Sequence, residues 1–297
     1  YGYYDLMITY INFGVSILFL EIGVGAMRFM FDKNEDKHVV AFNTFIIFGF
    51  SILAYSVLFF LITKINKVEH SNLVYFYGLF FAVQNYFGYI TRGYGNNKLF
   101  AISGLVCTLV TVFLTILMVV FLRMGYWSLY LSSIVGIGIQ LALIIINTDF
   151  LKSLNFKNKN FKLLTKILKY SIPFCLSTIA YWFLTSFNKV VISEIFGIEE
   201  NGYFAVAGKF SLAINLISSC FTLAWQELAF DKGGDDPNCG EFYSTACDAY
   251  MRFVFVGVLL LLPLIGIVFD FIIGKNYIPS KFLIPLGLMG AVANIFN

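Results

Sequence analysis

Long apolar stretches separated by short polar connections make up most of the chain. About nine can be placed, roughly at residues 4–27, 38–62, 71–90, 98–122, 125–148, 170–193, 203–225, 250–273 and from 280 to the end. About 20 helical residues cross the roughly 30 Å of hydrocarbon in a bilayer, so each stretch is long enough to span a membrane. The alternating pattern of barrel strands is absent, and lipid permits no third kind of spanning structure. The pattern therefore predicts transmembrane helices.

The composition fits a protein whose solvent is lipid. Of its 297 residues, 59% are hydrophobic and 12% charged, whereas about a quarter are charged in soluble domains. We expect an all-α integral membrane protein with a polytopic helix bundle. The net charge of +3 is too small to indicate a nucleic-acid partner. The five cysteines are scattered without CxxC spacing, so neither a disulfide framework, a metal site nor a cofactor is predicted.

Basic residues are distributed unequally between alternate connections. One set contains thirteen: Arg28, Lys33, Lys37, Arg92, Lys98, Lys152, Lys157, Lys159, Lys162, Lys166, Lys169, Lys232 and Arg252. The other set contains five: Lys64, Lys67, Arg123, Lys275 and Lys281. Because Lys and Arg accumulate on the cytoplasmic side, the connection after the first span is predicted to be cytoplasmic and Tyr1 to lie outside.

A lysine-rich amphipathic segment, residues 151–169, precedes the sixth span. We interpret it as a cytoplasmic linker held at the inner surface by anionic lipid. It would separate an N-terminal transmembrane lobe, residues 1–150, from a C-terminal lobe, residues 170–297. Since the chain opens on Tyr1 and stops within an apolar run, we expect the first lobe to lack its first helix and the second to be truncated.

A short motif recurs at long range. The sequence Tyr-Gly-Tyr-Tyr-Asp-Leu at residues 1–6 resembles Asn-Gly-Tyr-Phe-Ala-Val at 201–206, and Phe-Asp-Lys at 31–33 recurs at 230–232. Six spans, an even number, separate the copies. The pattern predicts a duplication whose two copies, each with six helices, share one orientation in the membrane.

Five landmarks together carry a family resemblance. They are YGYYDL at 1–6, GVGAMRF at 23–29, Ser171-Ile172-Pro173, NGYFAVAGKF at 201–210 and Ala224-Trp225-Gln226. Their order resembles the polysaccharide (Wzx-like O-antigen) flippases of the multidrug/oligosaccharidyl-lipid/polysaccharide exporter superfamily. The resemblance implies two six-helix lobes around a central cavity that opens alternately to either side. It also implies translocation of undecaprenyl-diphosphate-linked oligosaccharide across the bacterial inner membrane in O-antigen or other surface polysaccharide synthesis, such as lipopolysaccharide.

The resemblance further implies partners. These are the lipid-linked oligosaccharide, membrane lipids, a coupling proton or sodium ion, and polysaccharide polymerase and assembly proteins. The sequence departs from the family at Asn188-Lys189, near the outer end of the predicted span at residues 170–193. Related proteins often have Asp-Arg at this place. A carboxylate is lost there while the positive charge is kept, so an ion pair at this place is in doubt.

A diphosphate cargo requires fixed cations in a cavity that water reaches. Lys209, about two turns into its span, is the first candidate, and Lys189 near an outer helix end is the second. Arg28 and Arg92 at inner helix ends are candidates for loading the diphosphate. For Lys189 and Lys209 the alternative is snorkelling to the interface. For Arg28 and Arg92 it is positive-inside anchoring.

Three further residues have two interpretations each. Glu21 lies about seven residues from the inner end of its span and could couple transport to protons or sodium, or pair with Arg28 on the same helix face. Trp182 and Tyr181 could stack on sugar rings or pack between helices.

Two other function classes compete with a flippase. A drug or organic-cation antiporter of the same superfamily would rely on carboxylates within the membrane, whereas Lys189 and Lys209 against Glu21 favour an anionic cargo. A membrane-embedded glycosyltransferase or polysaccharide polymerase would need metal-binding or catalytic motifs in large outer loops. The outer loops here are short, without a DxD pattern, a Ser/His/Asp set or a phosphate-binding Gly loop, so we expect no enzyme.

Overall fold

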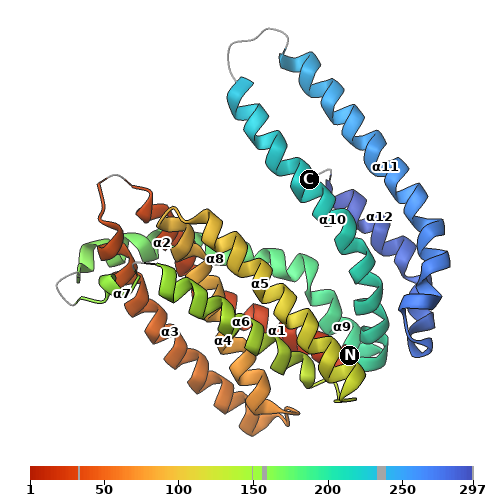
Figure 1. Ribbon diagram of the computed structural model, residues 1–297, viewed down its shortest axis with the longest axis horizontal. Coiled ribbons are helices and arrows are strands. Elements are labelled where there is room, and N and C mark those ends of the chain that lie inside the picture. Colours follow the sequence, from red (N-terminus) through yellow and green to blue (C-terminus); the bar gives the residue numbers. More distant parts are fainter. Residues whose placement is uncertain (33, 149, 156–158, 233–238, 296–297) are drawn as a thin grey trace. The chain divides into compact units, whose positions relative to one another are not determined.

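The computed structural model describes residues 1–32, 34–148, 150–155, 159–232 and 239–295. Within these ranges, side-chain surroundings are described except for residues 213, 217–232, 239–243, 268, 270, 272, 275 and 294–295. Every regular element of the described residues is a helix (Figure 1). The predicted all-α class is therefore confirmed.

Twelve α-helices follow one another along the described chain. They are α1 (Gly2–Leu18), α2 (Ile22–Met30), α3 (Lys37–Ile65), α4 (Ser71–Gly93), α5 (Asn97–Ile116), α6 (Ser128–Asn147), α7 (Phe150–Ser153), α8 (Phe161–Thr185), α9 (Phe187–Ile195), α10 (Ile198–Lys232), α11 (Cys239–Ile272) and α12 (Ile284–Ile295). Each predicted apolar stretch contains helix. Five described helices are long and apolar enough to span a bilayer, and the bent pair α1 and α2 makes six.

The first span is broken, which corrects the prediction of one continuous helix over residues 4–27. α1 ends at Leu18, α2 begins at Ile22, and their axes differ by 53°. Leu20 and Glu21 both have left-handed backbone angles, with φ of 51° and 50°. Neither Gly nor Pro lies between the two helices, so the sequence carries none of the usual signals for a break.

The described chain divides into two compact units. The first contains Tyr1 and Leu6–Asn188, and the second contains Gly2–Asp5 and Lys189–Asn297. The first turn of α1 is therefore part of the second unit and the rest of α1 part of the first. The sequence predicted two lobes instead, at residues 1–150 and 170–297, joined by a linker at 151–169. These lobes were defined by a predicted duplication and not by contacts, and they stay a prediction.

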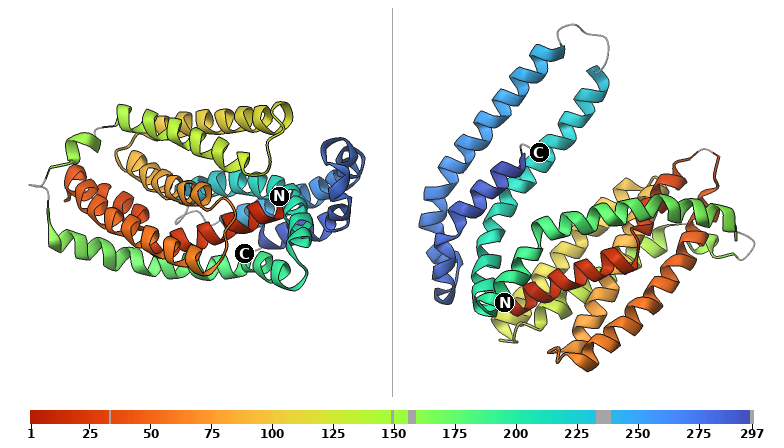
Figure 2. Two further views of the ribbon diagram at one scale, coloured as in Figure 1. Left: turned by 90° about the horizontal axis from the view of Figure 1, so that it is seen from below. Right: turned by 180° about the vertical axis from the view of Figure 1, so that it is seen from behind.

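In the first unit, α4 packs against α2 and α6, and α5 packs against α6. The ring of Tyr86 on α4 stacks on Phe48 of α3 at 4.4 Å, and its hydroxyl lies 3.0 Å from the Thr44 hydroxyl. α1 lies along α8 (Figure 2), where the Cys175 thiol donates to the backbone oxygen of Ser16. These contacts hold the broken span against α3, α4 and α8.

Hydrogen bonds fasten the linker region to the first unit. The Ser153 hydroxyl of α7 lies 2.8 Å from His38 Nδ1 of α3 and 2.5 Å from the Tyr94 hydroxyl at the end of α4. The backbone N–H of Asn160, which caps α8, donates to Asn43 Oδ1 of α3 at 2.9 Å. Partly buried polar contacts thus attach the linker near its start and at its middle, where α8 begins.

The second unit is built on α10, α11 and α12. α10 packs against α12, and both contact α11. Its core contains Ile214, Val254, Phe269, Ile284 and Leu288, all less than one-tenth exposed. The Phe-Asp-Lys motif of the predicted repeat occurs at residues 31–33 and 230–232. Lys33 and the side chains of residues 230–232 lie outside the described part of the structure, and so do the side chains of Trp225 and Gln226.

Candidate functional site

The break between α1 and α2 places Glu21 at the start of a half-helix. Its backbone oxygen accepts the N–H of Val24 at 3.0 Å and of Gly25 at 3.4 Å, so Glu21 caps α2. A left-handed conformation costs a non-glycine residue about 1 to 2 kcal/mol, and two occur in succession here. In membrane proteins, irregular backbone within a span is tolerated where it is buried in protein or lines a cavity.

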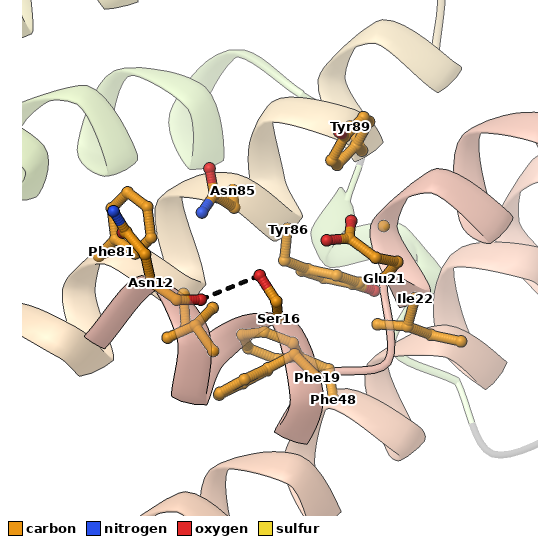
Figure 3. A pocket seen from close by; sticks show the side chains of 13 residues that line it. Asn12, Ser16, Phe19, Glu21, Ile22, Phe48, Phe81, Asn85, Tyr86 and Tyr89 are labelled. Atoms are coloured by element: carbon orange, nitrogen blue, oxygen red, sulfur yellow. Dashed lines mark hydrogen bonds between the residues drawn. The ribbon is translucent and has the colours of Figure 1, made fainter. Parts of the chain in front are cut away.

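A cavity of about 250 Å³ opens at this break. Figure 3 shows the Glu21 carboxylate pointing into it, with Asn85 and Tyr89 of α4 on the facing side. The remaining lining side chains are mainly apolar or aromatic, with Asn12 and Ser16 from α1. Among the described residues that line the cavity, the ionisable ones are Glu21 and two tyrosines, Tyr86 and Tyr89.

The neighbours of Glu21 are mostly neutral. Thr178 of α8 lies near its carboxylate. The Arg28 side chain, on the last turn of α2, is exposed, and no ion pair joins it to Glu21 among the described residues. The pairing of Glu21 with Arg28, one of the two interpretations from the sequence, is therefore not seen.

A second cavity, of about 400 Å³, lies between α4, α5 and α6. An amide pair forms part of its wall: Gln84 Nε2 of α4 donates to Gln140 Oε1 of α6 at 2.6 Å. Thr108 of α5 and Asn85 of α4 add further polar groups. No carboxylate occurs among the described residues around this cavity, so its one formal charge is positive and belongs to Arg92.

Arg92 is held by aromatic rings. Its guanidinium carbon lies 4.8 Å from the ring centre of Tyr89 on α4 and 5.1 Å from that of Phe100 on α5. Its Nε is buried and has no hydrogen-bond partner among the described residues. A guanidinium over a ring keeps its N–H donors in its own plane, where they can fork onto an oxyanion. The structure thus presents a held cation whose Nε–H donor has no partner among the described residues.

Two residues, Asn85 and Tyr89, line both cavities. Tyr89 also touches the first turn of α2, because a Cβ built on Gly23 would lie 2.5 Å from its Cδ2 atom. A carboxylate cavity and a guanidinium cavity therefore share one wall on α4. We call these two cavities the Glu21 cavity and the Arg92 cavity.

Lys189 is engaged at the other end of the span. Its Nζ lies 2.8 Å from Oδ2 of Asp5 on the first turn of α1, and the Asp5 side chain is 8% exposed against 27% for Lys189. The carboxylate that the sequence lacks beside Lys189 is supplied by α1. An ion pair does exist at this place, and this resolves the doubt that Asn188-Lys189 raised.

The two copies of the predicted repeat touch each other beside this pair. A Cβ on Gly2 would lie 2.1 Å from the backbone oxygen of Ile198 and 2.8 Å from the nitrogen of Gly202. The buried Asn201 side chain donates to the Gly2 backbone oxygen at 3.0 Å. We call Gly2, Asp5, Lys189, Asn201 and Gly202 the first-turn cluster.

The other predicted cations are exposed. Lys209 lies on α10 and Arg28 at the end of α2, and both side chains face away from their units' cores. Neither lines the Glu21 or the Arg92 cavity, whose described residues all belong to the first unit. The substrate-binding roles of Lys209, Lys189 and Arg28 stay predictions.

The two aromatic candidates differ in their surroundings. Trp182 is 8% exposed, stacks on Phe13 at 4.2 Å, and donates its indole N–H to the Thr9 backbone oxygen at 3.2 Å. Its position favours the packing interpretation. Tyr181 is 66% exposed. Sugar stacking by either residue stays a prediction.

Sequence reasoning missed the polar residues in the middle of the spans. Asn12, Gln84, Asn85, Tyr89 and Gln140 line the cavities, but they were not singled out. The signal was available, because a polar side chain within an apolar span needs a partner or a cavity. Their convergence on one wall depends on helix packing, which the sequence does not show.

Comparison with known proteins gives two matches. A protein-family model described as "Polysaccharide biosynthesis protein" matches residues 1–225. A solved structure described as "Inward-facing conformation of a multidrug resistance MATE family transporter of the MOP superfamily" is similar with a TM-score of 0.72 at 15% identity, covering 99% of this chain and 74% of that one. At this identity the likeness shows the fold. No curated protein matches the chain.

Proposed function

Because the chain belongs to the polysaccharide biosynthesis protein family, we propose that it translocates an undecaprenyl-diphosphate-linked oligosaccharide across the bacterial inner membrane by alternating access. Membership confirms the family resemblance, and the fold is that of a multi-pass transporter of the MOP superfamily. The proposal adds the cargo, the membrane and the direction, from the cytoplasmic to the outer leaflet. It also assigns the protein no covalent chemistry.

The Arg92 cavity carries this proposal. A diphosphate needs a fixed cation that water reaches and donors that can fork onto its oxygens. Arg92 offers both, since its Nε–H has no partner among the described residues and no described carboxylate lines the cavity. It lies at the end of α4 that the basic-residue count places on the cytoplasmic side, where a lipid-linked precursor would be loaded.

Amides and hydroxyls around the cavities suit the sugar part of the cargo. Gln84, Gln140 and Thr108 surround Arg92, while Asn12 and Asn85 face the Glu21 cavity. Such groups both donate and accept hydrogen bonds, as sugar hydroxyls do. The exposed Arg28 is assigned, with Arg92, to loading of the diphosphate from the cytoplasmic side, and Lys209 is assigned to diphosphate binding within its own span. Polysaccharide polymerase and assembly proteins would then receive the flipped product.

Glu21 is assigned the coupling ion. A carboxylate at a helix break inside a span can bind a proton or sodium, and intramembrane ionisable residues are functional by default. Its partly buried position in a cavity of its own, separate from Arg92, suits an ion that is exchanged during the cycle.

The test is flipping of a fluorescent polyprenyl-diphosphate saccharide in liposomes that contain the full-length protein. We expect Arg92→Ala to lower the flipping rate at least tenfold, because the loss of one charge-assisted contact costs about 1.5 to 3 kcal/mol. Lys98→Ala is the matched control, since Lys98 is an exposed cation at the neighbouring helix start. Equal rates in the two variants would contradict the assignment of the diphosphate to Arg92.

One observation favours a second function. Phe19, Phe48, Phe81 and Tyr86 surround Glu21 in its cavity, and a carboxylate among aromatic rings is what an organic cation binds. A drug antiporter would therefore lose transport of an organic cation in Glu21→Gln and keep it in Arg92→Ala. A flippase would show its larger loss in Arg92→Ala, with the polyprenyl-diphosphate substrate.

A further inference from the structure

We propose that the Arg92 cavity selects cargo whose first sugar, the one joined to the diphosphate, carries an acetamido group, and that Gln84 and Gln140 recognise this group. The inference rests on the proposed function, because it takes Arg92 as the site of the diphosphate. It adds the chemical class of the sugar and the residues that distinguish it from a plain hexose.

A close helix crossing holds Gln140 of α6 opposite Gly104 of α5. A Cβ built on Gly136, one turn before Gln140, would lie 2.9 Å from the backbone oxygen of Cys107. The backbones of α5 and α6 therefore approach closely here, as small residues allow between membrane helices. One turn further along α6, Gln140 Nε2 lies 3.9 Å from a Cβ built on Gly104. Packing of the two helices thus fixes this amide on the cavity wall.

The hydrogen bonds of the amide pair leave one donor group and one acceptor for a ligand. Gln84 Nε2 donates to Gln140 Oε1 at 2.6 Å and to the Cys107 sulfur at 3.8 Å. Gln140 Nε2 and Gln84 Oε1 make no hydrogen bond to any other described residue. Gln140 is only 3% exposed, and a buried amide donor is costly to leave without a partner. A ligand in the cavity therefore meets an amide N–H donor beside an amide oxygen.

An acetamido group is complementary to this pair. It has one N–H donor and one carbonyl acceptor in a single plane, as a peptide bond does. Its N–H can donate to Gln84 Oε1 while its carbonyl oxygen accepts from Gln140 Nε2. A sugar hydroxyl must serve both partners through one oxygen atom. The methyl group of the acetamido group has space at Gly104, where the nearest atom of another helix to a built Cβ is Gln140 Nε2.

The distance from Arg92 identifies which sugar the amides meet. Gln84 precedes Arg92 by eight residues on α4, which is about 12 Å along the helix axis. Phe100, Gly104 and Thr108 line the same cavity at successive turns of α5. A diphosphate and the one pyranose ring joined to it extend over a comparable length. With the diphosphate at Arg92, the group beside the amides therefore belongs to that first ring.

The experiment compares two fluorescent polyprenyl-diphosphate monosaccharides in liposomes that contain the full-length protein. The two lipids differ only at carbon 2 of the sugar, which carries an acetamido group in one and a hydroxyl in the other. We expect the acetamido lipid to flip at least about fivefold faster, because one additional net hydrogen bond is worth about that factor. The ratio of the two rates is the readout, since it does not depend on how much protein folds.

Two variants test the residues. Gln84→Leu/Gln140→Leu removes both amides together, so that neither is left without its partner, and it should bring the ratio below about twofold. Gly104→Ala fills the space for the methyl group and should lower the ratio by slowing the acetamido lipid more than the other. Gly49→Ala is the matched control and should keep the ratio. Gly49 is a half-buried glycine of α3 that lines neither cavity, with nothing within 4 Å of a built Cβ.

Arg92→Ala separates this inference from the proposed function. It should slow both lipids alike and leave the ratio as it is, because it removes a contact with the diphosphate that they share. Two outcomes overturn the role of the amide pair and leave the diphosphate site intact. One is equal flipping of the two lipids by the unmodified protein, and the other is a fivefold ratio that persists in the double variant. If neither lipid is flipped, the proposed function fails, and this inference fails with it.

Discussion

The first span has a tightly packed polar cluster at one end and an open polar cavity at the other. The first-turn cluster joins glycine backbones at contact distance, an ion pair of 2.8 Å and a buried amide hydrogen bond of 3.0 Å. The α1–α2 break, by contrast, has strained backbone, a cavity of about 250 Å³, and a carboxylate that points into it.

The comparison separates residues that hold α1 against neighbouring helices from residues that are available to bind a ligand. Close packing of small residues and hydrogen bonds between helices are how helices associate in lipid. An open cavity with unsatisfied donors does little for stability and leaves groups available for a ligand. Substitutions in the first-turn cluster should therefore change the free energy of unfolding, and substitutions at the cavities should change transport. Four predictions, in order of their effect on that free energy, test this contrast.

The largest effect is expected at Gly2. Gly2→Ala places a methyl group 2.1 Å from the backbone oxygen of Ile198, and overpacking against backbone costs about 3 kcal/mol. Unfolding of the full-length protein in mixed micelles with increasing SDS measures the change. Gly208→Ala, where nothing lies within 4 Å, should be neutral or slightly stabilising. Identical transitions for the two variants would refute the close crossing.

The ion pair should give the next effect, and an asymmetric one. Lys189→Ala removes the cation paired with Asp5, the more buried partner, and should cost about 2 kcal/mol, whereas Asp5→Ala should cost less. The double variant Asp5→Ala/Lys189→Ala should cost clearly less than the sum of the two single losses. The same SDS titration gives all the values for a double-mutant cycle. Additive losses would show that the two charges do not interact.

Strained backbone at the α1–α2 break predicts a substitution that slightly stabilises the protein, in contrast to the two destabilising changes above. Leu20→Gly removes the cost of a left-handed side chain but adds chain entropy, so it should stabilise by up to about 1 kcal/mol. Leu18→Gly, at the last helical residue of α1, should instead destabilise by up to about 1 kcal/mol. Melting temperatures of the two variants decide the matter, and a lower value for Leu20→Gly would argue against the break.

The smallest effect on unfolding should accompany a clear effect on transport. Asn85 is exposed and lines both cavities, so Asn85→Ala should change the unfolding free energy by less than about 0.5 kcal/mol. We expect it to slow flipping severalfold in the liposome assay, because an amide is lost from the shared wall. Asn97→Ala, an exposed asparagine at the start of α5, serves as the control for both measurements.

The sequence predicted the helices well, because a long apolar stretch is stable in lipid only as a structure that satisfies its own backbone hydrogen bonds. All nine stretches contain helix, and the sequence singled out Glu21 as a carboxylate about seven residues inside its span and Arg92 as a cation at an inner helix end. The break at Leu20–Glu21 could not be predicted, because it occurs in apolar sequence without Gly or Pro. Tertiary contacts with α3, α4 and α8 impose it there, against local propensity.

Partnerships across helices were also beyond the sequence. The Asp5–Lys189 pair joins positions 184 residues apart, and the Gln84–Gln140 pair joins positions 56 apart. Each residue alone looked like an interface anchor or an ordinary polar residue. Which helix faces which is decided by packing, so only the structure distinguishes Arg92, with its aromatic neighbours, from the exposed Arg28.

The contact between Gly2 and Gly202 has a consequence for ancestry. The two glycines hold equivalent positions in the predicted repeat, and a residue that touches its own equivalent lies on a symmetry axis. If the duplication is real, the ancestor was a homodimer with glycine against glycine at its two-fold axis. In a homodimer, every substitution occurs in both protomers, because one gene encodes them. In the predicted repeat the position equivalent to Asp5 is the buried Ala205, so fusion of the two copies would have allowed one of them to keep an ion pair that the other lacks.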